Sequence, residues 1–211
     1  MKSSFAVAAA ASLAMLCLAA PAHAGGTVRG AIGTGSFELD EKSGFDADAD
    51  TTVFDLRGAF DVSEHVFLRG EYTSASADEL DVEGTDFDID TDISALRLGA
   101  GYGANVGGVR FYGVAEFVQL EIEVEGEGDD GNGYGLTGGI ADQGKGKLLW
   151  SVELSFLDVE ETAGATLDAT VGYRFTPSLA GVVGLQSYAL EDGDDNELSL
   201  GALYLGLEAR F

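Results

Sequence analysis

The chain has 211 residues, with 11 Lys and Arg against 37 Asp and Glu and a formal net charge of −26. This balance argues against nucleic acid as a partner, because that binding depends mainly on Lys and Arg contacting phosphates. The 12 Phe and 7 Tyr argue against an acidic disordered protein, which would contain few aromatic residues.

The first 24 residues have the pattern of a secretory signal peptide. Lys2 precedes an apolar run at 5–20, and Ala22-His23-Ala24 places small residues around a cleavage site. We therefore expect residues 1–24 to be removed on export, leaving 25–211 as one domain without a dividing linker. The single cysteine, Cys17, lies in the removed part, so we expect no disulfide or thiol site in the domain.

Residues 25–211 contain no apolar stretch of about eighteen residues, so a helical membrane span is excluded. They repeat a segment of about ten residues followed by a turn, and segments such as 54–60 alternate apolar with polar residues, as strands do. The segment 109–120 alternates less clearly, and a bulge could change its phase. Ten strands are predicted, at 27–38, 52–61, 65–76, 93–103, 109–120, 133–141, 147–157, 165–175, 180–190 and 198–211.

Short turns at 61–64, 104–108, 142–146 and 176–179 alternate with longer connections at 39–51, 77–92, 121–132, 158–164 and 191–197, which hold 27 of the 37 acidic residues. An even number of strands with short turns at one rim is typical of outer-membrane barrels. The fold class predicted is therefore all-β, an antiparallel up-and-down transmembrane β-barrel of ten strands, with eight as the alternative. Acidic loops would face the exterior. A soluble periplasmic barrel, with its apolar face inward, stays open as another fold.

All seven arginines fall in predicted strands. An arginine on the lipid face at mid-membrane costs about 2 to 4 kcal/mol, so charged strand residues should face the lumen and pair there. The predicted lumen charge network contains Arg29, Asp55, Arg57, Arg69, Glu71, Arg97, Glu116, Glu153, Asp168, Arg174, Glu208 and Arg210.

Aromatic residues gather near the predicted rims, where they would form two interfacial girdles. The alternative is that aromatic residues are simply common in strands. The girdle residues would be Phe60, Phe67, Tyr102, Phe111, Trp150, Tyr173, Phe175 and Phe211 near the short turns, and Phe37, Tyr72, Tyr134, Phe156 and Tyr188 near the loops.

With these features, the chain resembles the small outer-membrane β-barrel proteins of Gram-negative bacteria, the OmpA-like and OmpX-like kind. Its segments 54–60, 96–102, 133–139 and 205–211 are similar to those of diffusible-signal-regulated outer-membrane barrels. The resemblance implies location in the outer membrane after export through the periplasm. It also implies that a barrel-assembly machinery recognises the last strand, through Leu203, Leu205, Leu207, Ala209 and Phe211.

Catalysis is not expected, because His65 is the one histidine after residue 24 and the domain lacks cysteine for a nucleophile–base pair. No cofactor is expected apart from loosely bound Ca²⁺ or Mg²⁺, which prefer carboxylate oxygens. The alternative is that these acidic runs are solvated loop charge. The candidate metal ligands are Asp46, Asp48, Asp50, Asp86, Asp88 and Asp90.

Ten strands lie near the size at which side chains fill the interior of a barrel. We therefore expect a plugged, monomeric barrel with an envelope-structural or surface-interaction role. The alternatives are a narrow channel that favours cations, or an adhesin or ligand-binding surface protein. Expected partners are outer-membrane lipid, lipopolysaccharide bridged by divalent ions, the assembly machinery and a host or surface ligand.

Overall fold

The computed structural model describes most of the predicted domain. The predicted signal segment lies outside the described residues. Among the residues described, no helix is long and apolar enough to cross a membrane. The described residues are 25–40, 42, 46–77, 79–82, 85–87, 89–124, 127–143, 146–160, 162–193 and 196–211.

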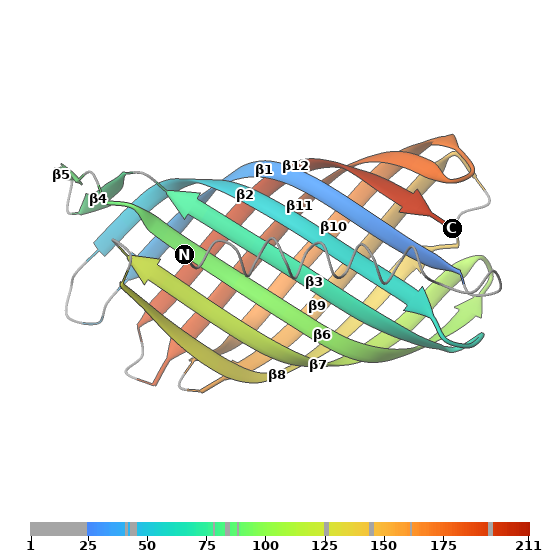
Figure 1. The fold of residues 1–211 in the computed structure, drawn as a ribbon, viewed down its shortest axis with the longest axis horizontal. Helices are drawn as coiled ribbons and strands as arrows, with labels where there is room; N and C mark the ends of the chain where they lie inside the picture. The colour runs from blue at the N-terminus through green and yellow to red at the C-terminus, as the bar shows by residue number, and fades with distance from the viewer. Residues whose placement is uncertain are drawn as a thin grey trace.

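In the part of the chain that the structure describes, ten long antiparallel strands form a closed barrel (Figure 1). The ring closes because β1 pairs with both β2 and β12. The predicted ten-stranded fold is confirmed, and the eight-stranded alternative is wrong. The strands are β1 (Gly26–Asp40), β2 (Asp46–Asp61), β3 (Val66–Ala77), β6 (Thr91–Val106), β7 (Val109–Val124), β8 (Glu127–Asp142), β9 (Leu148–Val159), β10 (Thr162–Thr176), β11 (Leu179–Asp192) and β12 (Glu197–Arg210).

One end of the barrel, here called the terminal end, carries both Gly25 and Phe211. Backbone hydrogen bonds join Gly26 to Phe211 in both directions, at 3.0 and 3.1 Å. At this end Gly107 and Gly108 form the two-residue connection between β6 and β7 with φ of 62° and 90°. Positive φ at both positions suits the turn that matches the twist of a hairpin, and glycine adopts it without steric cost.

The opposite end, here called the distal end, carries two further short strands, β4 (Leu80–Val82) and β5 (Thr85–Phe87). They form a hairpin, and β4 pairs with β2 at Ala47 and Asp48. Figure 1 shows this hairpin projecting at the end away from the C-terminus. The prediction of a loop at 77–92 is therefore wrong for these residues.

The long strands extend further toward the distal end than predicted. β7 runs to Val124 and β8 begins at Glu127, while β9 ends at Val159 and β10 begins at Thr162. The predicted long acidic loops at 121–132 and 158–164 are therefore wrong. Much of the acidic sequence forms strand, because acidic and apolar residues alternate there with the period of a strand.

Along each strand, from the terminal end to the distal end, the outward face changes from apolar to polar and the inward face changes from charged to apolar, as β9 illustrates. Toward the terminal end, Leu154 and Phe156 are exposed on the outside while Glu153 is buried inside. Two positions further on, Asp158 is exposed and Val159 is buried. Each strand presents large apolar residues outward nearer the terminal end, forming the outer belt. The belt includes Ile32, Phe54, Leu68, Leu98, Phe117, Leu136, Leu154, Leu167, Leu185 and Leu205.

The outer belt decides between the two barrel types. A soluble barrel would not surround itself with a continuous exposed apolar band, whereas hydrocarbon requires one. The chain is therefore a transmembrane barrel, and its belt is the surface that meets lipid.

The ambiguous strand β7 contains no bulge among its described pairings. It pairs without a register shift from Val109 to Val124 with both neighbours. Its alternation is weak because Val118 and Leu120 face inward into an apolar cluster, so both faces of the strand are apolar there. The irregularity occurs instead in β10, between Arg174 and Thr176.

The girdle prediction is wrong for three aromatic residues. Phe37, Phe67 and Tyr188 are 8%, 6% and 6% exposed and belong to the interior. The others that are clearly exposed on the outside include Tyr102, Phe111, Trp150, Tyr173, Phe175 and Phe211 toward the terminal end, and Tyr134 and Phe156 further along.

Candidate functional site in the barrel lumen

Arg57 on β2 lies at the centre of the charged interior. Its Nη1 is 3.0 Å from Glu153 Oε2 on β9 and its Nη2 is 3.2 Å from Asp168 Oδ2 on β10. Its Nε is 3.1 Å from Glu71 Oε2 on β3. One guanidinium therefore connects the adjacent strands β2 and β3 with β9 and β10 across the lumen.

Arg29 on β1 holds two further carboxylates. Its Nη2 lies 3.1 Å from Asp55 Oδ1 and 3.4 Å from Asp168 Oδ2. Its Nη1 donates to the Thr170 hydroxyl at 2.8 Å. The Tyr204 hydroxyl donates to the same Asp168 at 2.8 Å, so β12 also contributes to the arrangement.

Arg69 and Arg97 extend the pairing along β3 and β6. Arg69 Nη2 is 2.7 Å from Glu153 Oε2 and also contacts Glu71. Arg97 pairs with Glu116, and its Nη2 donates to the Ser155 hydroxyl at 2.8 Å. These contacts join all four arginines into one lumen network, whose members are Arg29, Asp55, Arg57, Arg69, Glu71, Arg97, Glu116, Glu153 and Asp168.

Among the described residues, the lumen network contains four guanidiniums and five carboxylates, and it is shielded from water. The side chain of Glu116 is 0% exposed, and that of Arg57 is 11% exposed. Buried charges persist when they are paired and hydrogen-bonded on all sides, which the interlocking contacts provide. The network therefore closes the middle of the lumen with fixed side chains.

The structure brings nine of the twelve predicted charged residues into the lumen network. The other three lie nearer the terminal end. Arg174 Nη2 is 3.6 Å from Asp142 Oδ2, and Arg210 Nε is 2.8 Å from Glu208 Oε1.

Sequence reasoning missed the uncharged members of this arrangement. Tyr112 donates to Glu153 at 2.5 Å, and the hydroxyls of Thr137 and Ser155 are 2.7 Å apart beside Arg97. Strand phase could have found Tyr112 and Tyr204, because they alternate in step with Glu116 and Glu208.

Inward aromatic rings occupy the space that glycines leave on neighbouring strands. A Cβ added at Gly139 would lie 2.3 Å from Tyr112 Cζ, and one at Gly184 would lie 2.3 Å from Tyr204 Cζ. The two tyrosines can therefore lie flat against the wall with their hydroxyls directed at the lumen network. A side chain at either glycine would displace the ring.

Beyond the lumen network, toward the distal end, the interior is apolar. Buried side chains from seven strands meet there and fill the space between the walls, as in a water-soluble protein. This inner apolar cluster contains Phe37, Ala49, Val53, Ala75, Ala77, Val118, Leu157, Val159, Tyr188, Leu190, Leu200 and Ala202. The lumen is therefore closed at two levels, first by the paired charged side chains of the lumen network and then by the side chains of the inner apolar cluster.

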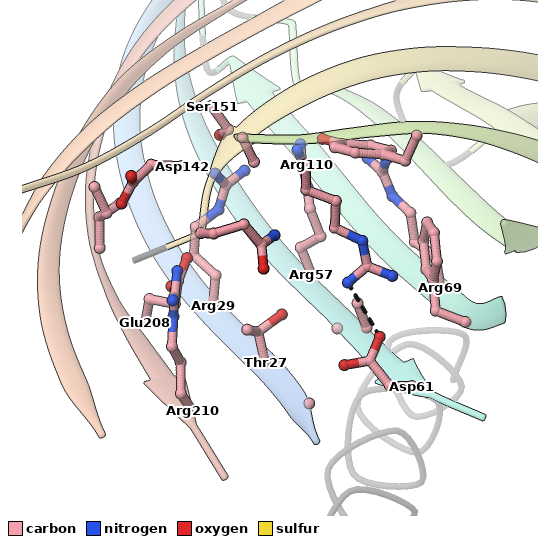
Figure 2. A pocket seen from close by; sticks show the side chains of 18 of the residues that line it. Thr27, Arg29, Arg57, Asp61, Arg69, Arg110, Asp142, Ser151, Glu208 and Arg210 are labelled. Atoms are coloured by element: carbon pink, nitrogen blue, oxygen red, sulfur yellow. Dashed lines mark hydrogen bonds and ion pairs between the residues drawn. The ribbon is translucent and has the colours of Figure 1, made fainter. Parts of the chain in front are cut away.

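Toward the terminal end the lumen opens into a cavity of about 340 Å³, here called the vestibule. Figure 2 shows Arg29, Arg57, Arg69 and Arg110 around this hollow, with Asp61 paired to Arg110. Arg110 Nη1 is 3.1 Å from Asp61 Oδ1. The vestibule is bounded on its inner side by Arg29, Arg57, Arg69 and Glu153 of the lumen network.

The predicted metal ligands do not form a described site. Asp48, Asp50 and Asp90 are exposed, while Asp88 and the side chains of Asp46 and Asp86 lie outside the described residues. Within the described part, no group of three or more His, Cys, Asp or Glu has a metal-binding arrangement. Metal binding stays a prediction.

The predicted assembly residues lie on the outside of β12 and just after it. Leu203, Leu205 and Leu207 are 59%, 66% and 56% exposed, and Phe211 is 49% exposed. Ala209 is exposed on the same face. They form one apolar stripe, which continues the outer belt to the terminal end.

The closed ring, the outer belt and the charged lumen agree with the comparison to known families. The family of the outer membrane protein beta-barrel domain matches residues 5–211. The chain belongs to this family. It is therefore an outer-membrane β-barrel of the Gram-negative type.

One solved structure supports the fold, and two others are similar to the chain to a lower degree. The outer membrane protease OmpT of Escherichia coli superposes with a TM-score of 0.53 at 11% identity, over 90% of this chain and 97% of that chain. Neisserial surface protein A gives 0.46 at 13% identity, over 88% and 97%. The attachment invasion locus protein Ail of Yersinia pestis gives 0.41 at 15%, over 88% and 99%. No curated protein matches the sequence. At these identities the likeness concerns the fold alone.

Proposed function

We propose that this outer-membrane barrel does not conduct and performs no catalysis, and that it supports a rigid acidic extension at the cell surface. The observation that carries the proposal is the double closure of the lumen. Arg57 reaches Glu153 across the interior, and the inner apolar cluster fills the lumen behind them. A solute would have to break buried ion pairs and then cross a packed apolar layer.

The orientation follows from the position of the outer belt. Outer-membrane barrels extend little beyond the membrane on the periplasmic side and further on the outer side; here the belt lies nearer the terminal end with Gly25 and Phe211, and the strands continue past it at the distal end. The distal end then faces outward. Its wall, which rises beyond the outer belt, presents exposed polar and acidic residues, including Ser36, Glu38, Asp48, Asp50, Asp92, Asp130 and Asp158.

This extension supports a role in surface interaction. Packed strands with an apolar interior hold their outer side chains in fixed positions, which favours contact with a partner over flexible solvation. Divalent ions between these carboxylates and lipopolysaccharide phosphates would supply one such contact. In outer-membrane vesicles, we expect a chelator to lower the thermal stability of the barrel. Unchanged stability would count against the ionic bridge.

Conductance measured in planar bilayers tests whether the lumen is closed. The purified protein, shown to be folded by heat-modifiable migration, should insert without producing channel currents, whereas a porin prepared in the same way should conduct. Stable single-channel steps from the folded protein would favour the narrow channel instead.

The apolar stripe of the last strand supports recognition by the barrel-assembly machinery. Phe211→Ser should reduce the amount of folded barrel in the outer membrane of expressing cells while the purified variant still refolds in detergent. Glu197→Gln, at the other end of the same strand, is the control. Normal assembly of the Phe211 variant would remove this partner from the proposal.

A further inference from the structure

A band of uncharged polar side chains separates the outer belt from the acidic wall beyond it. On the outward face of β2, the exposed belt residue Phe54 is followed toward the distal end by Thr52 and then by Asp50. The same order of apolar, neutral polar and acidic residues occurs on other strands around the ring. This neutral polar band contains Thr34, Thr52, Ser74, Ser76, Ser94, Gln119, Asn132 and Ser199.

The strand register places members of the neutral polar band side by side. Thr52 stands opposite Thr34 on β1 and opposite Ser76 on β3, while Ser74 stands opposite Ser94 on β6. Side chains directly opposite each other on one face have Cβ atoms about 4.5 to 5.5 Å apart. Within the described part of the chain, the hydroxyls of Thr34 and Thr52 form no hydrogen bond with another residue. They are therefore adjacent and available to a ligand.

The neutral polar band contains no positive side chain among the described residues. The arginines in the middle of the strands face the lumen, and the other Lys and Arg, apart from Lys42 beyond the end of β1, lie toward the terminal end. Lys and Arg are the side chains that hold lipid phosphates. The first charges beyond the band are carboxylates such as Asp50 and Asp92, roughly 7 Å further along their strands, which would repel phosphate.

The outer belt determines what covers the neutral polar band. Because the belt meets acyl chains, the next outward side chains meet the headgroup atoms that are attached directly to those chains. These atoms are a phosphate in a phospholipid and a sugar in a glycolipid. Serine and threonine hydroxyls and side-chain amides both donate and accept hydrogen bonds, as sugar hydroxyls do. An uncharged sugar therefore fits the band better than a phosphate.

We propose that the neutral polar band binds the sugar headgroup of a glycolipid in the outer leaflet, with Thr34 and Thr52 as one pair of binding hydroxyls. This inference deepens the proposed surface role and rests on the orientation given there, in which the distal end faces outward. Phosphates bridged by divalent ions would contact the carboxylates further out. The two contacts therefore lie at different heights on the wall.

Quenching by brominated lipids tests the band on the folded protein in vesicles. Ile32→Trp in a Trp150→Phe background places the single tryptophan one residue pair from Thr34, in the outer belt. The vesicles consist of phosphatidylcholine with a minor fraction of monoglucosyl diacylglycerol that carries brominated chains. We expect this glycolipid to be enriched about threefold beside position 32, which one net neutral hydrogen bond allows. In the parent protein Trp150, toward the terminal end, should report no enrichment.

Paired substitutions separate the hydroxyls from the shape of the surface. Thr34→Val with Thr52→Val removes both hydroxyls at similar volume and should abolish the enrichment, whereas Thr34→Ser with Thr52→Ser should keep it. Heat-modifiable migration shows which variants fold. Unchanged enrichment in the folded valine variant, equal enrichment at Trp150, or stronger enrichment of brominated phosphatidylglycerol at position 32 would overturn the proposal.

The failure of this proposal is distinguishable from that of the proposed function. The vesicles carry the glycolipid in both leaflets, so the quenching result does not depend on which end of the barrel faces outward. Closure of the lumen is measured separately by conductance, and the orientation by labelling on intact cells.

Discussion

The Arg57 guanidinium meets the Glu153 carboxylate at 3.0 Å although their strands, β2 and β9, stand opposite each other in the ring. Four strands separate them in either direction around the barrel. The contact is thus a tether across the lumen, and it pulls together walls that share no backbone hydrogen bonds.

Replacing either end of this tether should destabilise the barrel, but unequally. Arg57→Met leaves several buried carboxylates without their shared partner and should cost about 3 to 5 kcal/mol of unfolding free energy. Glu153→Gln should cost less, because the lumen network holds one more carboxylate than guanidinium among the described residues. Urea unfolding in lipid vesicles, followed by the fluorescence of the single tryptophan Trp150, measures both.

The control for these variants is Asp158→Asn, which removes an exposed carboxylate from the same strand β9. It should change stability by no more than about 0.5 kcal/mol. Equal losses of unfolding free energy for Arg57→Met and Glu153→Gln would contradict the explanation from the extra carboxylate in the lumen network.

The two closures of the lumen should act in series. Replacing both Arg57 and Glu153 by Ser removes the tether but leaves the inner apolar cluster, so the folded variant should remain silent in planar bilayers. Adding Phe37→Ser and Leu157→Ser, which are 8% and 7% exposed in the cluster, should produce current. Conductance from the first variant alone would show that the apolar cluster does not seal.

Substitutions at two adjacent glycines on β8 distinguish the effect of side-chain packing from that of a change in the backbone. Gly139→Ala places a Cβ 2.3 Å from Tyr112 Cζ, and moving this ring would disturb its hydrogen bond to Glu153. We expect a loss of about 1 to 3 kcal/mol by overpacking. At Gly138 a Cβ meets nothing within 4 Å, so Gly138→Ala should be nearly neutral. Similar urea midpoints for the two variants would argue against the fit of ring to glycine.

Cysteine labelling locates the membrane boundary. With Cys17 replaced by Ser, a single cysteine at Ser36 or Glu38, both exposed beyond the outer belt, should react on intact cells with an impermeant maleimide. A cysteine at Leu136 or Leu205 should not, because these residues lie in the belt. Labelling at Leu205 before cell lysis would place the belt outside the bilayer.

The strands were predictable because apolar and polar residues alternate along them, both in the outer belt and in the wall beyond it. The connection predicted at 121–132 is strand up to Val124 and again from Glu127. Leu120 and Ile122 line a small interior cavity, so Glu121 and Glu123 fall on the opposite, outward face of the strand. A high density of acidic residues is therefore compatible with regular strand. In a strand that extends above a membrane, acidic residues can occupy every second position, on the outward face.

The interior was predictable only in part, for a geometric reason. Period-two phase identifies which residues of one strand face inward, and it placed Arg57 and Glu153 in the lumen. It does not give strand tilt or the reach of a side chain across the ring, so the pairing of Arg57 with β9 and the hydrogen bonds of Tyr204 could not be foreseen. The missing quantity is the shear of the closed sheet.

The exchange of polarity along each strand also fixes the height of the barrel in its membrane. A displacement outward by one residue pair, roughly 7 Å along a strand, would lift belt leucines such as Leu203 into water. A displacement inward would draw carboxylates such as Asp158 into hydrocarbon. Both directions raise the free energy around the whole circumference. The change of polarity along the wall therefore restricts vertical displacement and tilt of the barrel to a small fraction of the bilayer thickness.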